Sequence, residues 1–191
     1  MLLKLSTSLR KYANGWLVLA FFAGLVLFHA IIFPAQQANL RNISGGTNPI
    51  DLLFFYTPEE VYAMVASYGE EGRAAYRAFE LTGDIVYPIL YTLFFTLFIT
   101  WLFQRGFQAE SPMQRLNITP LGAWLFDLLE NFGIAGMLSV YPSTPAALAW
   151  ASAVFTLFKW LFVGTSILLS FIGIAMALKN TLKNHPKELA R

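Results

Sequence analysis

Four long apolar segments, separated by more polar ones, dominate the hydrophobic pattern of the chain. Each has at least about 18 residues, which at about 1.5 Å per residue lets a helix cross a hydrocarbon core of roughly 30 Å. The pattern therefore predicts an all-α protein, a bundle of four transmembrane helices with a short amphipathic helix in the outer loop. The expected spans, all within a single domain over residues 1–191, are 16–33, 81–103, 119–141 and 146–178.

The one long polar segment, residues 34–80, is predicted to be a loop that holds the short helix. Thr57 is a good N-cap for that helix, and Glu60 completes a capping box with it. Gly69 marks its expected end. Residues 52–56 are too apolar for a free loop, so we expect this part to lie in the membrane interface or to cover the bundle.

The third span carries polar side chains near its middle, where lipid offers no hydrogen-bond partner. At about 100° per residue, Asp127, Glu130 and Asn131 share one face of this helix. A charged group that faces lipid costs at least ~2.5–3.5 kcal/mol, so this face must turn toward protein or water. The other spans are therefore expected to pack around it.

The fourth span contains a narrow stripe of polar and small residues that is expected to face the bundle. These residues recur every seven positions and are Ser152, Lys159, Ser166 and Gly173. The rise per residue puts Lys159 at a similar depth to Glu130, within the middle of the membrane. The sequence thus predicts an acid–amide–lysine cluster in which Lys159 meets Glu130 and Asn131.

The second span adds polar groups from one helix face, on a helix that is expected to start near Glu70. They are Arg73, Arg77, Glu80, Asp84, Tyr87 and Tyr91, at spacings of three, four and seven. With His29 of the first span, the last three should lie in the outer half of the membrane. The predicted ligand-binding residues are His29, Asp84, Tyr87, Tyr91, Asp127, Glu130, Asn131 and Lys159, around a cavity that opens outward beneath the loop helix.

Each of these features also has a purely structural interpretation. Glu130 and Lys159 could neutralise each other as a clamp between two helices, and His29 could be a packing residue. The face from Arg73 to Asp84 could be an exposed helix surface with salt bridges. Glu80 and Asp84 with His29 could bind a divalent cation, but there is no tight metal-ligand motif, so no metal site is predicted.

Composition and charge narrow the class of protein. The chain is 57% hydrophobic and 13% charged, which is typical of a membrane protein and excludes a disordered one. A net charge of only +2 gives no indication of a nucleic-acid partner, and none is predicted. The absence of cysteine excludes disulfides, thiolate metal sites and iron–sulfur clusters. The sequence does not indicate any particular cofactor.

Lysine and arginine near the spans predict the orientation. Three precede the first span, two lie in the loop 104–118, four lie in the C-terminal tail, and the turn 142–145 has none. The chain is therefore predicted to be a multi-pass protein of the cell membrane, with both termini in the cytoplasm and the aromatic loop outside.

Three motifs, YGEEGRAAYRAFELTGDIVYPILY, FDLLEN and LFKW, lie within roughly residues 55–165. This pattern resembles small four-span bacterial membrane proteins whose activity is uncharacterised. The layout of one span, an outer loop with short helices and three more spans with internal acids also resembles the EXPERA superfamily of sterol isomerases and related receptors. That second resemblance is one of architecture, and it implies carboxylates in a lipid-accessible cavity.

These features favour a protein of the lipid bilayer that binds a small amphipathic or lipid-like molecule. The apolar part of that molecule would lie along aromatic side chains such as Phe95 and Trp124. A lipid-modifying enzyme, in which Glu130 or Asp84 moves a proton, is one alternative. Others are a homo-oligomer or a structural subunit of a larger membrane complex, and an ion- or proton-coupled transporter. A transporter needs a path of acids, whereas polar groups become sparse between Asp127 and the cytoplasm.

The orientation can be tested with reporter fusions at Gly45 and at the C-terminus. Because the positive charge lies near the termini, we expect the C-terminal reporter to be active only in a cytoplasmic assay and the Gly45 reporter only outside. A C-terminus found outside would reverse the orientation of every span.

Overall fold

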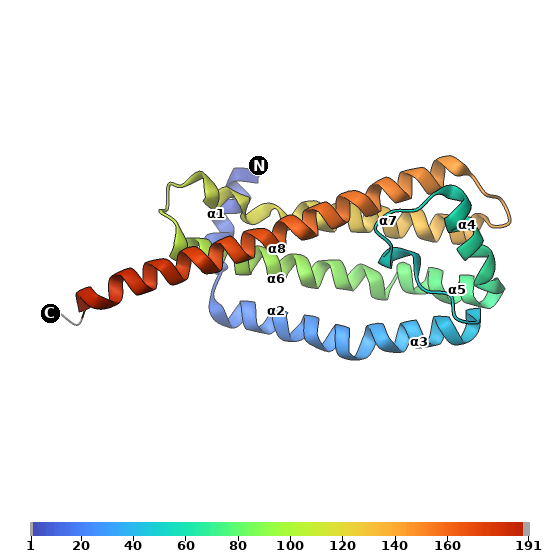
Figure 1. Cartoon of the computed structure of the whole chain (residues 1–191), viewed down its shortest axis with the longest axis horizontal. Coiled ribbons are helices and arrows are strands. Elements are labelled where there is room, and N and C mark those ends of the chain that lie inside the picture. Colours follow the sequence, from blue (N-terminus) through green and yellow to red (C-terminus); the bar gives the residue numbers. More distant parts are fainter. Residues whose placement is uncertain (1, 189–191) are drawn as a thin grey trace.

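The computed structural model describes residues 2–188, which form helices joined by turns, without a strand in that range (Figure 1). The helices are α1 (Leu2–Tyr12), α2 (Gly15–Leu27), α3 (Phe33–Ser44), α4 (Pro58–Ser67), α5 (Gly69–Glu80), α6 (Gly83–Gly106), α7 (Pro120–Val140) and α8 (Ala146–Glu188). A π-helical turn (Phe28–Ile32) joins α2 to α3, and 3₁₀ turns lie at Ile50–Leu52 and Pro112–Ile118.

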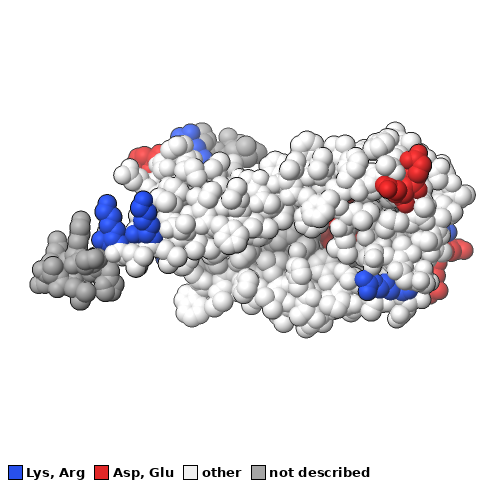
Figure 2. Space-filling view, in the orientation of Figure 1, with Lys and Arg blue, Asp and Glu red and all other residues white. Residues whose placement is uncertain are grey.

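Four helical segments of the described chain are long and apolar enough to cross a membrane. They are Gly15–Ser44, Gly69–Gly106, Pro112–Val140 and Ala146–Lys183. On the face shown in Figure 2, charged side chains gather at the two ends of the molecule and the middle is almost uncharged. The chain is therefore an all-α, multi-pass membrane protein built as a four-helix bundle, as the hydrophobic pattern predicts.

The bundle has a tight core of three helices and one peripheral helix. Helices α6, α7 and α8 pack against one another, with α7 and α8 in the most extensive contact. Among the long helices, α2 packs mainly on α6 and lies at the side of the bundle (Figure 1). The start of α2 and the C-terminal part of α8 lie at one end, and α4 and α5 at the other.

The first span, which begins with α2, is longer than predicted. The loop that was expected to start at residue 34 starts only after Ser44. The helix passes through Pro34 and ends at Ser44, where Gly45 adopts a left-handed φ of 68°. Proline normally interrupts a helix because it lacks an N–H. Here the helix widens just before Pro34, since the N–H of Phe33 bonds to the carbonyl of Phe28, five residues earlier.

The expected helix from Glu70 into the second span is interrupted at residues 81–82, between α5 and α6. The Arg73 guanidinium lies 4.3 Å from the centre of the Tyr141 ring, and Glu80 is fully buried. The one ion pair among the described residues lies elsewhere. The interpretation of Arg73–Asp84 as an exposed, salt-bridged face is therefore wrong.

The short loop helix α4 forms as predicted. The Thr57 hydroxyl accepts a hydrogen bond from the Glu60 N–H at 3.3 Å, and the Glu60 carboxylate accepts one from the Thr57 N–H at 2.8 Å. Gly69, with a φ of 66°, separates α4 from α5. Val61 and Val65 are fully buried in the core cluster that includes residues of α7 and α8, so α4 covers the end of the bundle.

The polar stripe of α8 faces the bundle, as predicted. Ser152, Lys159 and Ser166 are buried. A Cβ atom at Gly173 would lie 2.9 Å from the Leu102 side chain, so α8 and α6 approach closely there. Helix α8 continues well past the ends of the other spans (Figure 1).

The contact between α7 and α8 can be tested at two glycines. A Cβ atom at Gly133 would lie 2.6 Å from Ser152 Oγ, whereas nothing lies within 4 Å of one at Gly164. We expect Gly133→Ala to destabilise the protein by about 1–3 kcal/mol through overpacking. Gly164→Ala should be neutral or slightly stabilising, because alanine favours a helix. Thermal unfolding in detergent measures both, and equal midpoints would contradict the close approach.

Candidate functional site

The centre of the site is the ion pair between Lys159 Nζ of α8 and Glu130 Oε2 of α7. Both side chains are buried in the middle of the bundle. The second oxygen of Glu130 accepts a hydrogen bond from the Thr156 hydroxyl at 2.7 Å. The predicted meeting of the third and fourth spans through these two residues is confirmed.

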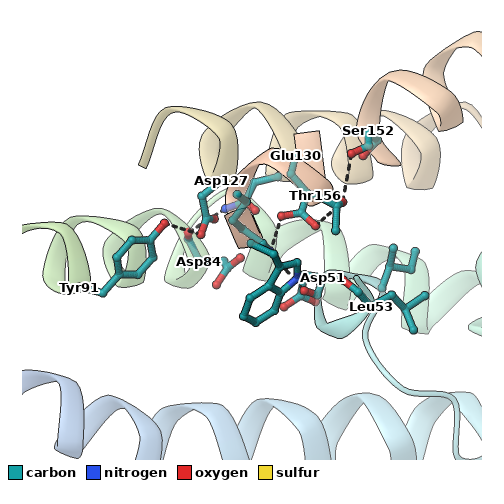
Figure 3. A network of polar contacts seen from close by, with 12 residues as sticks. Asp51, Leu53, Asp84, Tyr91, Asp127, Glu130, Ser152 and Thr156 are labelled. Carbon is teal, nitrogen blue, oxygen red and sulfur yellow. Dashed lines mark hydrogen bonds and ion pairs between the residues drawn. The ribbon is translucent and has the colours of Figure 1, made fainter. Parts of the chain in front are cut away.

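A loop segment, residues 50–57, enters the bundle and lies against this ion pair; we call it the strap. Lys159 Nζ donates to the Asp51 carbonyl at 3.2 Å, and Trp160 Nε1 donates to the Leu53 carbonyl at 3.0 Å. From α5, the Tyr76 hydroxyl donates to the Asp51 carboxylate at 2.6 Å. Figure 3 shows the strap residues below the side chains of α7 and α8. The strap is thus held by two helices.

The strap adds no ionised tyrosine to the site. The Tyr56 side chain is 1% exposed, and its burial raises its pKa to about 12. The hydroxyl is therefore neutral at physiological pH, and the charge of the site comes from the carboxyl groups and Lys159.

Asn131 supports the backbone of α6. Pro88 has no N–H, so the carbonyl of Asp84, four residues earlier, lacks its helical partner. Asn131 Nδ2 donates to this carbonyl at 2.8 Å. The Asn131 amide therefore joins α7 to α6 at the place where Pro88 removes a helical hydrogen bond of α6. Within the described chain, no hydrogen bond connects Asn131 to Lys159, so the expected acid–amide–lysine contact is only partly present.

A cavity of about 400 Å³ lies beside this polar network. Its lining combines polar and apolar side chains from the π-helical turn, α3, the strap, α6, α7 and α8. The polar ones are His29, Gln37, Asp51, Asp84, Tyr87, Tyr91, Asp127 and Lys159. The apolar ones are Phe33, Pro34, Leu52, Phe95, Trp160 and Val163.

Six of the eight predicted ligand-binding residues line this cavity, and Glu130 and Asn131 lie behind its wall. Phe95 also lines the cavity, as expected. Trp124 does not, and the tryptophan in the lining is Trp160. The sequence prediction omitted Asp51, since nothing in the loop sequence indicates that this residue returns to the middle of the bundle.

The cavity opens at the side of the bundle. Its walls are α8 on one side and the π-helical turn with α3 on the other. Figure 2 shows acidic atoms at the bottom of a hollow on this side, away from both ends. No residue of α4 lines the cavity, so the predicted opening beneath the loop helix is wrong. Asp51 and Leu52 of the strap form part of the wall instead.

The carboxyl groups of the site differ in their partners. Asp127 accepts a hydrogen bond from the Tyr91 hydroxyl at 2.9 Å (Figure 3). The Asp84 carboxyl is part of the cavity lining and makes no hydrogen bond or ion pair with the described residues. Glu80, the last residue of α5, is fully buried, and neither of its carboxyl oxygens has a hydrogen-bond partner in the described chain.

His29 lies at the rim, where its ring contacts Phe33 and Tyr87. Its Nδ1 is 3.2 Å from the Leu25 carbonyl, and its Nε2 is 3.5 Å from the Tyr87 hydroxyl. These contacts support the packing interpretation of His29. Among the described residues, no group of three acids or histidines is arranged to hold a metal ion, which disfavours the divalent-cation alternative.

Polar residues continue from the site toward the end of the bundle that carries the termini. They are buried on the inner side of α6 and in the following turn, and are Thr92, Thr96, Thr100 and Asn117. Polar groups are thus less sparse here than predicted. However, none of the buried polar side chains described in this part is ionisable.

The chain matches no family model, no curated protein and no solved structure. The two resemblances drawn from the sequence therefore stay predictions, and the function has to be argued from the geometry of the site.

The ion pair can be tested by a double-mutant cycle. Lys159→Met should lower the free energy of unfolding by about 3–5 kcal/mol, because it leaves the Glu130 carboxylate buried without its partner. Adding Glu130→Gln to this variant should restore part of the loss. Thermal unfolding in detergent measures both steps. Additive effects of the two substitutions would show that the residues do not interact.

Proposed function

We propose that the protein is a multi-pass protein of the cell membrane that binds a small amphipathic or lipid-like molecule in the side cavity. The observation that supports this most is that one cavity combines ionisable and apolar side chains. Asp84 and Asp127 contribute carboxyl groups to its lining, and Phe95, Trp160 and Val163 contribute apolar surface. Its volume of about 400 Å³ lies within the range of small-molecule pockets.

The position of the mouth supports a ligand that enters from the membrane. A hollow at the side of a membrane-crossing bundle faces the hydrocarbon region, where lipids and amphipathic molecules concentrate. The peripheral packing of the first span leaves this side open, since α2 packs mainly on α6 and α3 mainly on α5, and neither packs extensively on α8.

The charges favour a ligand whose polar end is positive. The single lysine of the site is already paired with Glu130, whereas the Asp84 carboxyl has no partner among the described residues. A carboxylate or phosphate would be repelled by Asp51, Asp84 and Asp127. An ammonium group would be attracted to them, and the rings of Tyr87, Tyr91 and Trp160 could contact it through cation–π interactions.

The alternatives have less support. A purely structural clamp would need only the Lys159–Glu130 pair, and it accounts for neither the cavity nor the unpartnered carboxyl of Asp84. A transporter would need an ionisable path across the membrane, and the buried polar groups beyond Asp127 are uncharged. A lipid-modifying enzyme would use the same cavity, with Asp84 as the group that reaches a bound molecule.

The orientation is proposed from the charge distribution, with both termini in the cytoplasm. In this orientation the strap and α4 lie on the outer side of the membrane, and the cavity lies in the outer half of the bilayer.

Binding can be tested by extracting purified protein and identifying retained molecules by mass spectrometry. We expect the wild type to retain an amphipathic compound, enriched over bulk lipid and carrying a basic nitrogen. Asp84→Asn should retain at least about fivefold less, since a charged hydrogen-bond partner contributes about 1.5–3 kcal/mol.

Glu110→Gln, which removes an exposed acid at the other end of the bundle, is the matched control and should behave as the wild type. Equal amounts of bulk lipid and nothing else from all three proteins would refute ligand binding and leave the structural role.

A further inference from the structure

The site contains more acid than base, by a wide margin. Five carboxyl groups surround it, from the strap, the end of α5, α6 and α7, and they are Asp51, Glu80, Asp84, Asp127 and Glu130. One amine, that of Lys159, faces them from α8. If all were ionised, the site would carry a net charge of 1 − 5 = −4 at the depth of the membrane.

No other described group compensates this charge. The side chains that face the carboxyls from neighbouring elements are the hydroxyls of Tyr76 on α5 and of Tyr87 and Tyr91 on α6, and the His29 ring at the rim makes no ion pair with them. The two arginines of α5 are engaged at the end of the bundle, Arg73 above the Tyr141 ring and Arg77 3.4 Å from the Ser139 hydroxyl. The imbalance is therefore a property of the whole site.

An empty cavity at this depth cannot hold four uncompensated negative charges. Neighbouring carboxylates repel each other, and each ionised group without a partner is costly in a low-dielectric environment. The carboxyls that lack both an ionic and a hydrogen-bond partner among the described residues, Glu80 and Asp84, must therefore carry protons or face a bound cation. The buried Glu80, with no hydrogen-bond partner for either oxygen, fits a carboxyl that holds a proton.

We propose that the cavity exchanges protons for an organic cation: carboxyl groups that hold protons in the empty site release them when the positive end of a ligand enters. This inference rests on the proposed function. Asp84 is the principal exchanging group, because it lines the cavity and has no protein partner among the described residues. The O–H bond of its carboxyl breaks, the proton passes to water, and the carboxylate faces the ammonium group.

The direction of the pH dependence follows from this exchange. Protons and the cation compete for the same carboxyls, so the affinity for a cation of fixed charge rises with pH. Each proton displaced contributes up to about a tenfold increase in affinity per pH unit. The effect levels off where the empty site has already lost the exchanging proton.

The probe for the test is tritiated decyltrimethylammonium, because its charge does not change with pH. Binding to the purified full-length protein in nanodiscs would be measured by scintillation proximity from pH 5 to 8.5, and tritiated decanol and decanoate would be measured in parallel as the neutral and anionic counterparts. Proton release would be followed with an indicator dye in weak buffer. For the wild type we expect affinity that rises toward tenfold per pH unit and a release close to one proton per bound probe.

Asp84→Asn should bind the probe more weakly and with a flatter pH dependence, while Glu110→Gln should match the wild type. The number of protons that the wild type releases per bound probe tests the exchange even if Asp84→Asn does not fold.

Saturable binding of the probe with no pH dependence and no proton release would overturn the exchange and leave the proposed function standing. Saturable binding of decanol without binding of the cation would refute both the exchange and the positive charge of the ligand. Saturable binding of none of the three molecules would overturn the exchange and the proposed function together.

Discussion

The ion pair between Lys159 and Glu130 is the interaction on which the rest of the site depends. A lysine in the middle of a membrane span needs a partner, because a charge exposed to lipid there costs several kcal/mol. The pair therefore requires the inner faces of α7 and α8 to meet at one level. Lys159 also donates to the Asp51 carbonyl, so the same ammonium group holds the strap inside the bundle. Loss of this contact would leave the strap held by the hydrogen bonds of Trp160 and Tyr76 alone.

The pair also determines the charge of the cavity beside it. Since Glu130 pairs with the one lysine that lines the cavity, the carboxyls of Asp51, Asp84 and Asp127 face the cavity without an ion-pair partner among the described residues. Stability and the proposed binding are thus connected through Lys159. A substitution of Lys159 would change both the packing of α7 on α8 and the charge that a ligand meets, so its effects on binding can be interpreted only beside its effects on unfolding.

Two irregularities in the helices shape the cavity. In the first span the π-helical turn before Pro34 widens the helix and places His29 and Phe33 at the rim. In α6, Pro88 leaves the Asp84 carbonyl without its helical partner, and Asn131 fills this role from α7. Prolines thus occur in two walls of the same cavity, and each is accommodated by a specific local change. Regular helices in both positions would pack more uniformly and leave less space between them.

The sequence by itself determined the four spans, the capped loop helix, the inward stripe of α8 and the meeting of Lys159 with Glu130. Helical periodicity and the cost of charge in lipid are local rules, so residue spacing is sufficient for these features. Only the tertiary structure decided the course of the strap, the burial of Glu80, the role of Asn131 and the side opening of the cavity. These depend on how a loop folds back between helices and on the packing of α2 mainly against α6. Such contacts between distant parts of the chain leave no periodic pattern in the sequence.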